Sequence, residues 1–405
     1  MNKHIRYSLL FLVLFLTALA QAVNKNQSDS VRISLLTCAP GEEIYSLFGH
    51  TAIRYEEPAK GIDIVFNYGL FNFNTPNFML RFALGETDYE LGAIPYERFA
   101  AEYEYFGRSV WKQELAIDQV EKEKLISLLE ENLRPENRIY RYNFFYDNCA
   151  TRPRDKIEEA IHGKVIYLPR TKNGETKSFR DIVHQYTLKH PWAQFGIDFC
   201  VGSEADKPIT DRLKMFAPFY LKTAFENAQI NRDSLHLPLV SRTEKIIDCE
   251  RWAENESAPE TDIWDTMTPM RCSLLLLIIV AGVTIYGIRH KKSLWGLDVL
   301  LFAVAGIAGC VIAFLALFSQ HPAVSSNYLL FVFHPLHLFC LPFFIYKERK
   351  GQKSRYHIAN AIVLTLFIAL FITIPQRIDF AVLPLALCLL IRSASNLILT
   401  YKKKK

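Results

Sequence analysis

The chain has 405 residues, enough for two or three domains, and half of its residues are hydrophobic. Its formal net charge of +5 includes four consecutive lysines at positions 402–405. No basic stripe with interleaved aromatic residues is present, which argues against a nucleic-acid partner.

The first 22 residues have the pattern of a secretory signal peptide. Met1–Arg6 is basic, Leu9–Leu19 is apolar, and Ala20-Gln21-Ala22 supplies the small residues of a cleavage site. We therefore expect the mature protein to begin near Val23, outside the cytoplasm. No cysteine closely follows the apolar run, so a lipoprotein signal is not expected.

Residues 23–249 are expected to form one exported domain. The patterns predict strands over Val31–Thr37, Ser46–Tyr55, Ile62–Tyr68 and Arg138–Phe145, and helices over Ile117–Leu133 and Lys156–Ile161. Beyond Phe179 mostly helices and loops are expected. Residues 250–271 are polar and rich in turn formers, which predicts a tether.

Five apolar runs between residues 272 and 401 predict a bundle of five transmembrane helices. The runs are Cys272–Ile288, Leu297–Phe318, Tyr328–Tyr346, Ile358–Ile374 and Phe380–Leu397. Each is close to the ~20 residues that cross a bilayer. The loops at 289–292 and 347–355 and the tail at 402–405 are basic, so positive-inside logic places them in the cytoplasm. The domain before residue 250 then faces outward.

Cys149 lies where an aromatic, strand-like stretch gives way to a charged, helix-like one. Near the first turn of a helix, free N–H groups and the helix dipole favour a thiolate, which is the nucleophilic form of cysteine. The alternative is a small buried hydrophobe, the usual role of a free cysteine. Pro153 is tolerated only in the first turn of a helix, so it leaves the start of the helix open.

His50 is the candidate partner of Cys149, about a hundred residues upstream. A strand histidine is often only a structural hydrogen-bonding group. Gly49 immediately before it, however, indicates close approach by a ligand or another backbone.

Asn67 is the candidate third member of the site. If Tyr55 pairs with Ile62 across an antiparallel hairpin, His50 falls opposite Asn67, and paired residues share a face. A Cys–His–Asn set is the papain-like arrangement, in which the amide orients the imidazole and the imidazole deprotonates the thiol. The choice of Asn67 depends on this register, and Asp63 is a weaker substitute.

These residues resemble a known family. The motifs Ser46-x-Phe48-Gly49-His50-Thr51, Phe66-Asn67-Tyr68-Gly69-x-Phe71-x-Phe73 and Tyr146-Asp147-Asn148-Cys149-Ala150-Thr151-Arg152 are similar to the exported domain of the Lnb-type bacterial lipoprotein N-acyltransferases. The order of histidine before cysteine is similar to circularly permuted NlpC-type enzymes of the papain-like group. The resemblance covers roughly Arg32–Asp211, and that family also carries a C-terminal multi-span region.

The resemblance implies an α+β, permuted papain-like (NlpC-like) exported domain followed by five transmembrane helices. It implies a cysteine-dependent acyltransferase of the inner membrane, with its N-terminal domain in the periplasm and its C-terminus in the cytoplasm. Cys149 would be the nucleophile, His50 the base and then the acid, and Asn67 the candidate orienting group. A phospholipid would donate an acyl chain through a Cys149 thioester to the N-terminal amine of a lipid-modified cysteine on a lipoprotein, with no cofactor.

Three further polar residues are weaker candidates for substrate binding. Arg152 could contact a phosphate or pair on the surface, whereas His321 and Asn327 could hold a lipid headgroup or simply belong to a polar loop. No Cys-x-x-Cys or His-x-x-x-His pair predicts a metal site. Export permits disulfides among Cys38, Cys200 and Cys249, and a bridge from Cys200 to Cys249 is one guess.

Two other functions stay open. With water as the acceptor, the same fold would be a cell-wall peptidase, an amidase or a lipid hydrolase. Without catalysis, it would be a membrane-anchored binding or sensor domain, although the short cytoplasmic loops argue against a signalling module.

Overall fold

The computed structural model describes residues 31–72, 74–168, 176–232, 235–249 and 266–402. These residues form two compact units. The first unit contains residues 31–72, 88–168, 211–232 and 235–249, and the second contains 74–87, 176–210 and 266–402. Two internal segments that precede residue 250, 74–87 and 176–210, therefore belong to the same unit as the apolar helices.

The first unit is built on a seven-stranded sheet in the order β10-β5-β1-β2-β3-β4-β6, with antiparallel pairing throughout. Its strands are β1 (Arg32–Cys38), β2 (His50–Glu57), β3 (Ile62–Leu70), β4 (Asp88–Pro95), β5 (Val110–Leu115), β6 (Ile139–Arg141) and β10 (Val240–Ile247). A smaller sheet contains β7 (Lys164–Tyr167), β8 (Ala228–Arg232) and β9 (Leu235–Pro238).

Helices cover both faces of the large sheet. Helix α3 (Tyr96–Tyr105) packs on one face, where Phe99 and Tyr103 join Ala52 and Val65 in a buried core. The opposite face carries α4 (Gln119–Leu133), α5 (Thr151–Ala160) and α9 (Pro218–Glu226), while the short α8 (Asp211–Lys214) precedes α9. Alternation along the strands produces these two apolar faces, because successive side chains point in opposite directions.

Local sequence signals set several boundaries of these elements. Asp118 and Glu121 form a capping box, so α4 begins at Gln119, two residues later than the pattern predicted. The hairpin between β2 and β3 turns through Pro58–Lys60 and closes at Gly61, which adopts a left-handed conformation with φ +66°. Strands β8, β9 and β10 were not predicted beyond Phe179.

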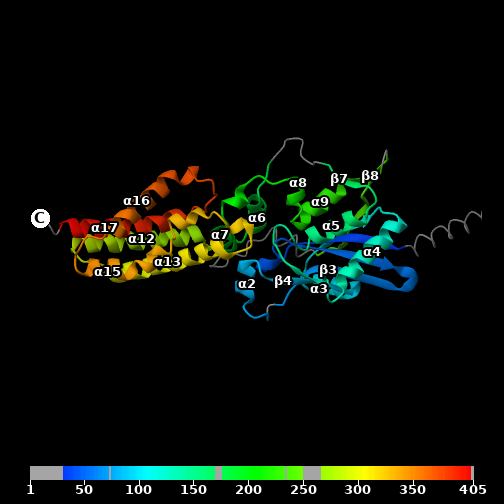
Figure 1. Cartoon of the computed structure of the whole chain (residues 1–405), viewed down its shortest axis with the longest axis horizontal. Helices are drawn as coiled ribbons and strands as arrows, with labels where there is room; N and C mark the ends of the chain where they lie inside the picture. Colours follow the sequence, from blue (N-terminus) through cyan, green and yellow to red (C-terminus); the bar gives the residue numbers. More distant parts are fainter. Residues whose placement is uncertain (1–30, 73, 169–175, 233–234, 250–265, 403–405) are drawn as a thin grey trace, which may run out of the picture. The chain divides into compact units, whose positions relative to one another are not determined.

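The second unit is helical. Its helices are α2 (Phe78–Leu84), α6 (Phe179–Thr187), α7 (Pro191–Cys200), α12 (Pro269–Arg289), α13 (Trp295–Phe318), α14 (Leu336–Phe339), α15 (Leu341–Arg349), α16 (Arg355–Leu370) and α17 (Val382–Lys402). It also has 3₁₀ turns: η3 (Ser203–Asp206), η4 (Pro322–Val324), η5 (Tyr328–Phe331) and η6 (Phe371–Thr373). Helices α12, α13 and α17 run side by side (Figure 1).

Within the described residues, four helices are long and apolar enough to cross a membrane: Pro269–Arg289, Trp295–Phe318, Arg355–Thr373 and Val382–Thr400. The third of the five expected spans, Tyr328–Tyr346, is not a continuous helix but is divided among η5, α14 and α15. Pro335 and Pro342 lack the N–H that an uninterrupted helix would use. Gly309 of α13 lets this segment approach closely, because a Cβ there would lie 2.6 Å from the backbone of Phe333 and His334.

Three expectations fall wholly or partly outside the described residues. They are the signal peptide at 1–22, most of the tether at 250–271, and the basic tail at 402–405, of which only Lys402 is described.

Candidate active site

Cys149 lies two residues before α5, at the end of a loop that side chains hold firmly. The Asn148 side-chain oxygen accepts the N–H groups of Ala150 and Thr151 at 2.8 and 3.0 Å, and its amide donates to the carbonyls of Phe144 and Phe216. Asn148 thus satisfies two N–H groups at the start of α5 and also ties the loop to the core.

The position of Pro153 resolves the question about the start of α5. The helix begins at Thr151, so Pro153 is its third residue and stays within the first turn. The missing N–H has no helical partner at that position, so the proline is tolerated there.

An aromatic cluster joins the segment before His50 to the segment before Cys149. The rings of Phe48 and Phe144 lie 4.9 Å apart, and Phe216 packs on Phe144 and Phe145. Because Phe48 is only 8% exposed, this packing fixes the two motifs against each other.

Gly69 leaves room for the nucleophile candidate. It has φ +96°, and a Cβ built on it would lie 3.4 Å from Cβ of Cys149 and 3.9 Å from the Tyr140 hydroxyl. A Cβ at position 69 would make an ordinary van der Waals contact with Cys149, but the positive φ would strain the backbone of any residue other than glycine.

His50 and Asn67 are in hydrogen-bond contact, with Nε2 of His50 3.2 Å from Oδ1 of Asn67. The Asn67 amide nitrogen faces the Val65 carbonyl at 3.5 Å, which orients its oxygen toward the ring. An amide oxygen can only accept, so Nε2 carries the proton and Nδ1 keeps its lone pair. The imidazole is therefore in the tautomer that can take a proton through Nδ1.

The strand register differs by two residues from the one assumed from the sequence. Tyr55 pairs with Ile64, not Ile62, and Ile53 pairs with Phe66. Asn67 is thus a diagonal neighbour of His50 instead of its direct partner. Because side chains alternate with a period of two, a shift of two keeps both residues on the same face. Asp63, the weaker substitute, instead forms a bidentate ion pair with Arg54.

The electrostatics of the site favour a protonated Cys149 thiol over the thiolate that a helix start would favour. Burial raises the pKa of the Cys149 thiol to about 11, although N–H groups of Thr51 and of Cys149 itself, and then the Arg108 charge, act to lower it. Burial also lowers the pKa of His50 to about 4, with the Arg108 charge acting in the same direction. At neutral pH the resting pair is therefore a neutral thiol and a neutral imidazole.

Arg108 is a contributor that the sequence did not reveal. Its Nε donates to the Ala39 carbonyl at 2.8 Å, and its guanidinium lies 4.9 Å from the centre of the Tyr103 ring. Its charge influences both His50 and Cys149. Packing between segments distant in sequence brings Arg108 to the site, as its contact with Ala39 shows. The residues next to Arg108 in the sequence form no motif that would have predicted this.

These shifts predict the pH dependence of thiol acylation. His50 accepts a proton only when it is neutral, so the acylation rate should stay nearly constant from about pH 6 to 9 and fall tenfold per unit below about pH 4. Measuring labelled acyl transfer onto Cys149 across this range checks the prediction. Thiolate ultraviolet absorbance present in the wild type at pH 7 and missing from Cys149→Ala would contradict a neutral resting pair.

A continuous run of aromatic rings leads from the neighbourhood of Cys149 to the surface. Tyr142 stacks on Tyr89 at 4.0 Å, Tyr89 on Phe71 at 4.9 Å, and Phe71 meets Tyr45 edge-on at 5.9 Å. Burial, and then the nearby Cys149 thiol, raise the pKa of Tyr142 well above its usual value. Tyr89 is 8% exposed and Tyr45 is 63% exposed, so the run passes from the interior to solvent.

The three weaker candidates already make contacts within the protein. Arg152 forms a bidentate ion pair with Asp147 in the first unit, and its guanidinium lies 3.6 Å from the centre of the Tyr140 ring. His321 and Asn327 belong to the second unit. Nε2 of His321 lies 3.1 Å from the Phe82 carbonyl, and Asn327 donates to the Phe199 carbonyl.

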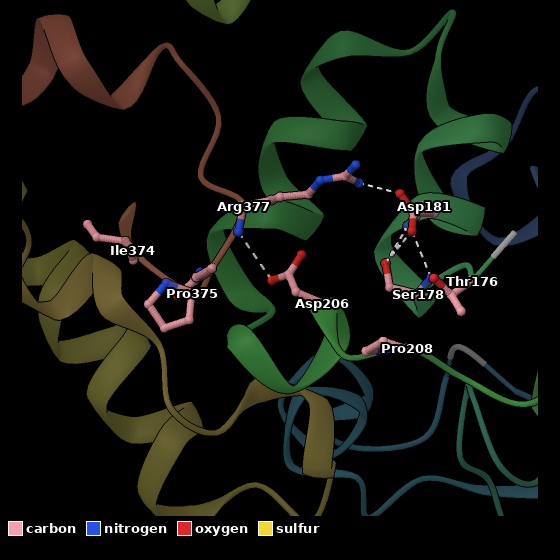
Figure 2. A pocket seen from close by; sticks show the side chains of 9 residues that line it. Thr176, Ser178, Asp181, Asp206, Pro208, Ile374, Pro375 and Arg377 are labelled. Atoms are coloured by element: carbon pink, nitrogen blue, oxygen red, sulfur yellow. Dashed lines mark hydrogen bonds and ion pairs between the residues drawn. The ribbon is translucent and has the colours of Figure 1, made fainter. Parts of the chain in front are cut away.

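A hollow of about 350 Å³ lies within the second unit (Figure 2). Arg377 points toward Asp181 and forms an ion pair with it, while its backbone N–H donates to Asp206 at 3.3 Å. Ser178 is bonded to Asp181 through the capping box of α6. The polar groups that line the hollow therefore bind one another. The contacts of Arg377 with Asp181 and Asp206 hold the 374–377 loop against α6.

Arg180 is a buried cation that links α6 to α7 and to η3. It is 1% exposed and pairs with both Asp198 and Asp206 while also donating to the Val201 and Gly202 carbonyls. Removing it leaves two carboxylates buried without their cation.

We expect Arg180→Met to destabilise α6 and α7 by about 3 kcal/mol, the usual cost of leaving a buried charge unpaired. Hydrogen exchange of the amides in these helices measures the effect. Arg377→Met is the matched control, because that side chain is 58% exposed and its ion pair should contribute less than about 1 kcal/mol. Equal effects of the two variants would contradict the assignment.

Among the described residues no two cysteines form a disulfide, so the guessed bridge between Cys200 and Cys249 is not formed. The two residues also belong to different units. Within the described segments, no group of three or more His, Cys, Asp or Glu side chains is arranged to hold a metal ion.

Two family models match the chain. The model of the Lnb N-terminal periplasmic domain matches residues 18–185, and the model of the Lnb transmembrane domain matches residues 260–404. No curated protein and no solved structure matches it.

Proposed function

The chain belongs to the Lnb family, whose members have a periplasmic N-terminal domain and a transmembrane domain. We propose that it is a lipoprotein N-acyltransferase. It moves a fatty acyl chain from a membrane phospholipid, through a thioester on Cys149, to the N-terminal amine of a lipid-modified cysteine on a lipoprotein. The family indicates a membrane protein that modifies lipoproteins, and the donor, the acceptor and the mechanism are our proposal.

In the first step, His50 takes the proton of the Cys149 thiol as the sulfur attacks the ester carbonyl of the phospholipid. The S–C bond forms, the ester C–O bond breaks, and His50 returns its proton to the departing alcohol oxygen. The products are an acyl thioester and a lysophospholipid.

In the second step, the amine of the lipoprotein attacks the thioester carbonyl. The N–C bond forms, the C–S bond breaks, and His50 carries the proton from the amine to the leaving sulfur. The two steps balance without a cofactor or an external energy source.

The single observation that carries this proposal is the arrangement around Gly69. A Cβ at position 69 would lie 3.4 Å from Cβ of Cys149, while Asn67, two residues earlier on β3, holds His50 through Nε2. A thiol at Gly69 and an imidazole held by Asn67, two residues earlier on the same strand, support covalent acyl transfer. The aromatic run from Tyr142 to Tyr45 supports an acyl chain as the transferred group, because aromatic rings extend from the neighbourhood of Cys149 to the surface and could contact such a chain.

The membrane part fits the same proposal. Both substrates carry acyl chains anchored in the bilayer, so an enzyme that joins them must work at its surface. We propose a multi-pass protein of the inner membrane with the Cys149 domain in the periplasm and the C-terminus in the cytoplasm. We retain the five-span topology and the permuted papain-like fold as part of this proposal; in the third span, η5, α14 and α15 would cross the bilayer together as a broken helix.

Reconstitution with labelled phospholipid and a diacylated lipopeptide tests the function. We expect the label to appear as an amide on the lipopeptide N-terminus, identified by mass spectrometry, in the wild type but not in Cys149→Ala. Free labelled fatty acid with no N-acylated peptide would instead indicate a lipid hydrolase. Cleavage of the peptide, or of a cell-wall fragment, without movement of the label would indicate a peptidase or amidase.

A further inference from the structure

Tyr140 ends in a buried hydroxyl with no hydrogen-bond partner among the described residues. The residue lies on β6, pairs with Tyr89 of β4, and is 6% exposed. A buried hydroxyl without a partner is costly, and native structures contain few of them. This O–H group therefore calls for an explanation.

The hydroxyl lies beside the candidate nucleophile. The point where a Gly69 Cβ would stand is 3.9 Å from the Tyr140 hydroxyl and 3.4 Å from Cβ of Cys149. The missing side chain thus leaves one small space that both groups border. Attack on an ester would turn its carbonyl oxygen into an oxyanion close to the sulfur, and that oxyanion requires donors.

We propose that Tyr140 is a catalytic residue whose O–H donates a hydrogen bond to the oxyanion of the tetrahedral intermediates. This inference rests on the proposed acyl transfer at Cys149. The hydroxyl is unpaired in the resting protein because its partner is created only when a substrate reacts. The N–H groups that face Cys149, from Thr51 and from Cys149 itself, would supply the other donors.

The surroundings of Tyr140 suit a donor. The Arg152 guanidinium lies 3.6 Å from the centre of its ring and is fixed there by Asp147. A cation on the ring face withdraws electron density from the phenol and makes its O–H a stronger donor. Burial raises the pKa of Tyr140, so the hydroxyl keeps its proton at neutral pH. Arg152 thereby has a positioning role in place of the phosphate contact considered from the sequence.

Tyr68 supplies the matched comparison. Its ring lies 6.2 Å from that of Tyr140, but its hydroxyl donates to Asn132 of α4 at 2.9 Å and is satisfied in the resting protein. The two neighbouring buried tyrosines therefore differ mainly in their hydrogen bonding. The Tyr68 hydroxyl donates to a protein group, whereas the Tyr140 hydroxyl has no partner among the described residues.

The test compares Tyr140→Phe with Tyr68→Phe in the full-length protein, using labelled phosphatidylethanolamine in detergent micelles. We expect Tyr140→Phe to slow thioester formation about 10²–10³-fold with little change in KM, the usual loss for one oxyanion donor. Tyr68→Phe should stay within about threefold of the wild type. The melting temperature of Tyr140→Phe should not fall, because no resting hydrogen bond is lost.

Alkylation of Cys149 by iodoacetamide separates a donor from a merely structural role, since that reaction forms no oxyanion. It should proceed at the wild-type rate in Tyr140→Phe. A rate of thioester formation in Tyr140→Phe within threefold of the wild-type rate would overturn the inference. An alkylation rate that falls by the same factor as the acylation rate would also overturn it. If the wild type itself forms no thioester, the proposed function fails together with the role of Tyr140. A normal wild-type thioester with a normal Tyr140→Phe rate refutes the role of Tyr140 alone.

Discussion

Replacing Cys149 with alanine should abolish acyl transfer, with a loss of about 10⁵-fold or more, because no other group can carry the acyl chain between donor and acceptor. The fold should survive, since the loop around Cys149 is held by Asn148 and by the Phe48–Phe144 contact and not by the thiol. N-acylation of a lipopeptide, measured by mass spectrometry, gives the loss directly.

Two variants sharpen this result. Cys149→Ser should be nearly as inactive as Cys149→Ala, because a hydroxyl is a far weaker nucleophile beside a neutral imidazole. Cys310→Ala removes a thiol from α13 in the second unit and should keep wild-type activity. Equal losses in Cys149→Ala and Cys310→Ala would show that the effect is not specific to the proposed nucleophile.

The second large effect is expected at His50. With the Cys149 pKa raised to about 11, very little thiolate exists at pH 7, so attack depends on a base that removes the proton. His50→Gln should therefore slow thioester formation about 10⁴-fold at pH 7. Raising the pH should partly restore the variant, because hydroxide then generates the thiolate, whereas the wild type should change little.

Asn67 should matter much less than His50. Asn67→Ala removes one neutral hydrogen bond to the imidazole, so a loss of about tenfold is expected. Asn67→Asp places a carboxylate beside His50, which raises the pKa of the imidazole and moves the acidic limb of the rate profile to higher pH. An unshifted limb in Asn67→Asp would mean that Asn67 does not contact the working base.

The sequence predicted the strands near His50 and Asn67 because their alternation is local. Its register was two residues off, yet the shared face survived because the error was an even number. The helix after Cys149 was expected to begin at Lys156 but begins at Thr151, where Asn148 accepts the Thr151 N–H and Pro153 fits the first turn.

What depends on contacts between distant segments could not be predicted. The raised pKa of Cys149 reflects burial among aromatic residues from several strands and loops, and the charge of Arg108 arrives from the end of α3. The incorporation of segments 74–87 and 176–210 into the helical unit depends on contacts with residues far along the chain, which local periodicity does not encode. Pro335 and Pro342 mark the interruption of the third apolar run in the sequence. Hydrophobicity alone, however, makes this run long enough for a membrane span.

The central claim is that Cys149 carries the acyl chain. Its most direct test is intact-protein mass spectrometry of the wild type, quenched after incubation with phospholipid in the absence of an acceptor. We expect a mass increase of one acyl chain, located on Cys149, that neutral hydroxylamine removes. A wild-type protein that transfers acyl chains without such an adduct, or an adduct that persists in Cys149→Ala, would contradict it.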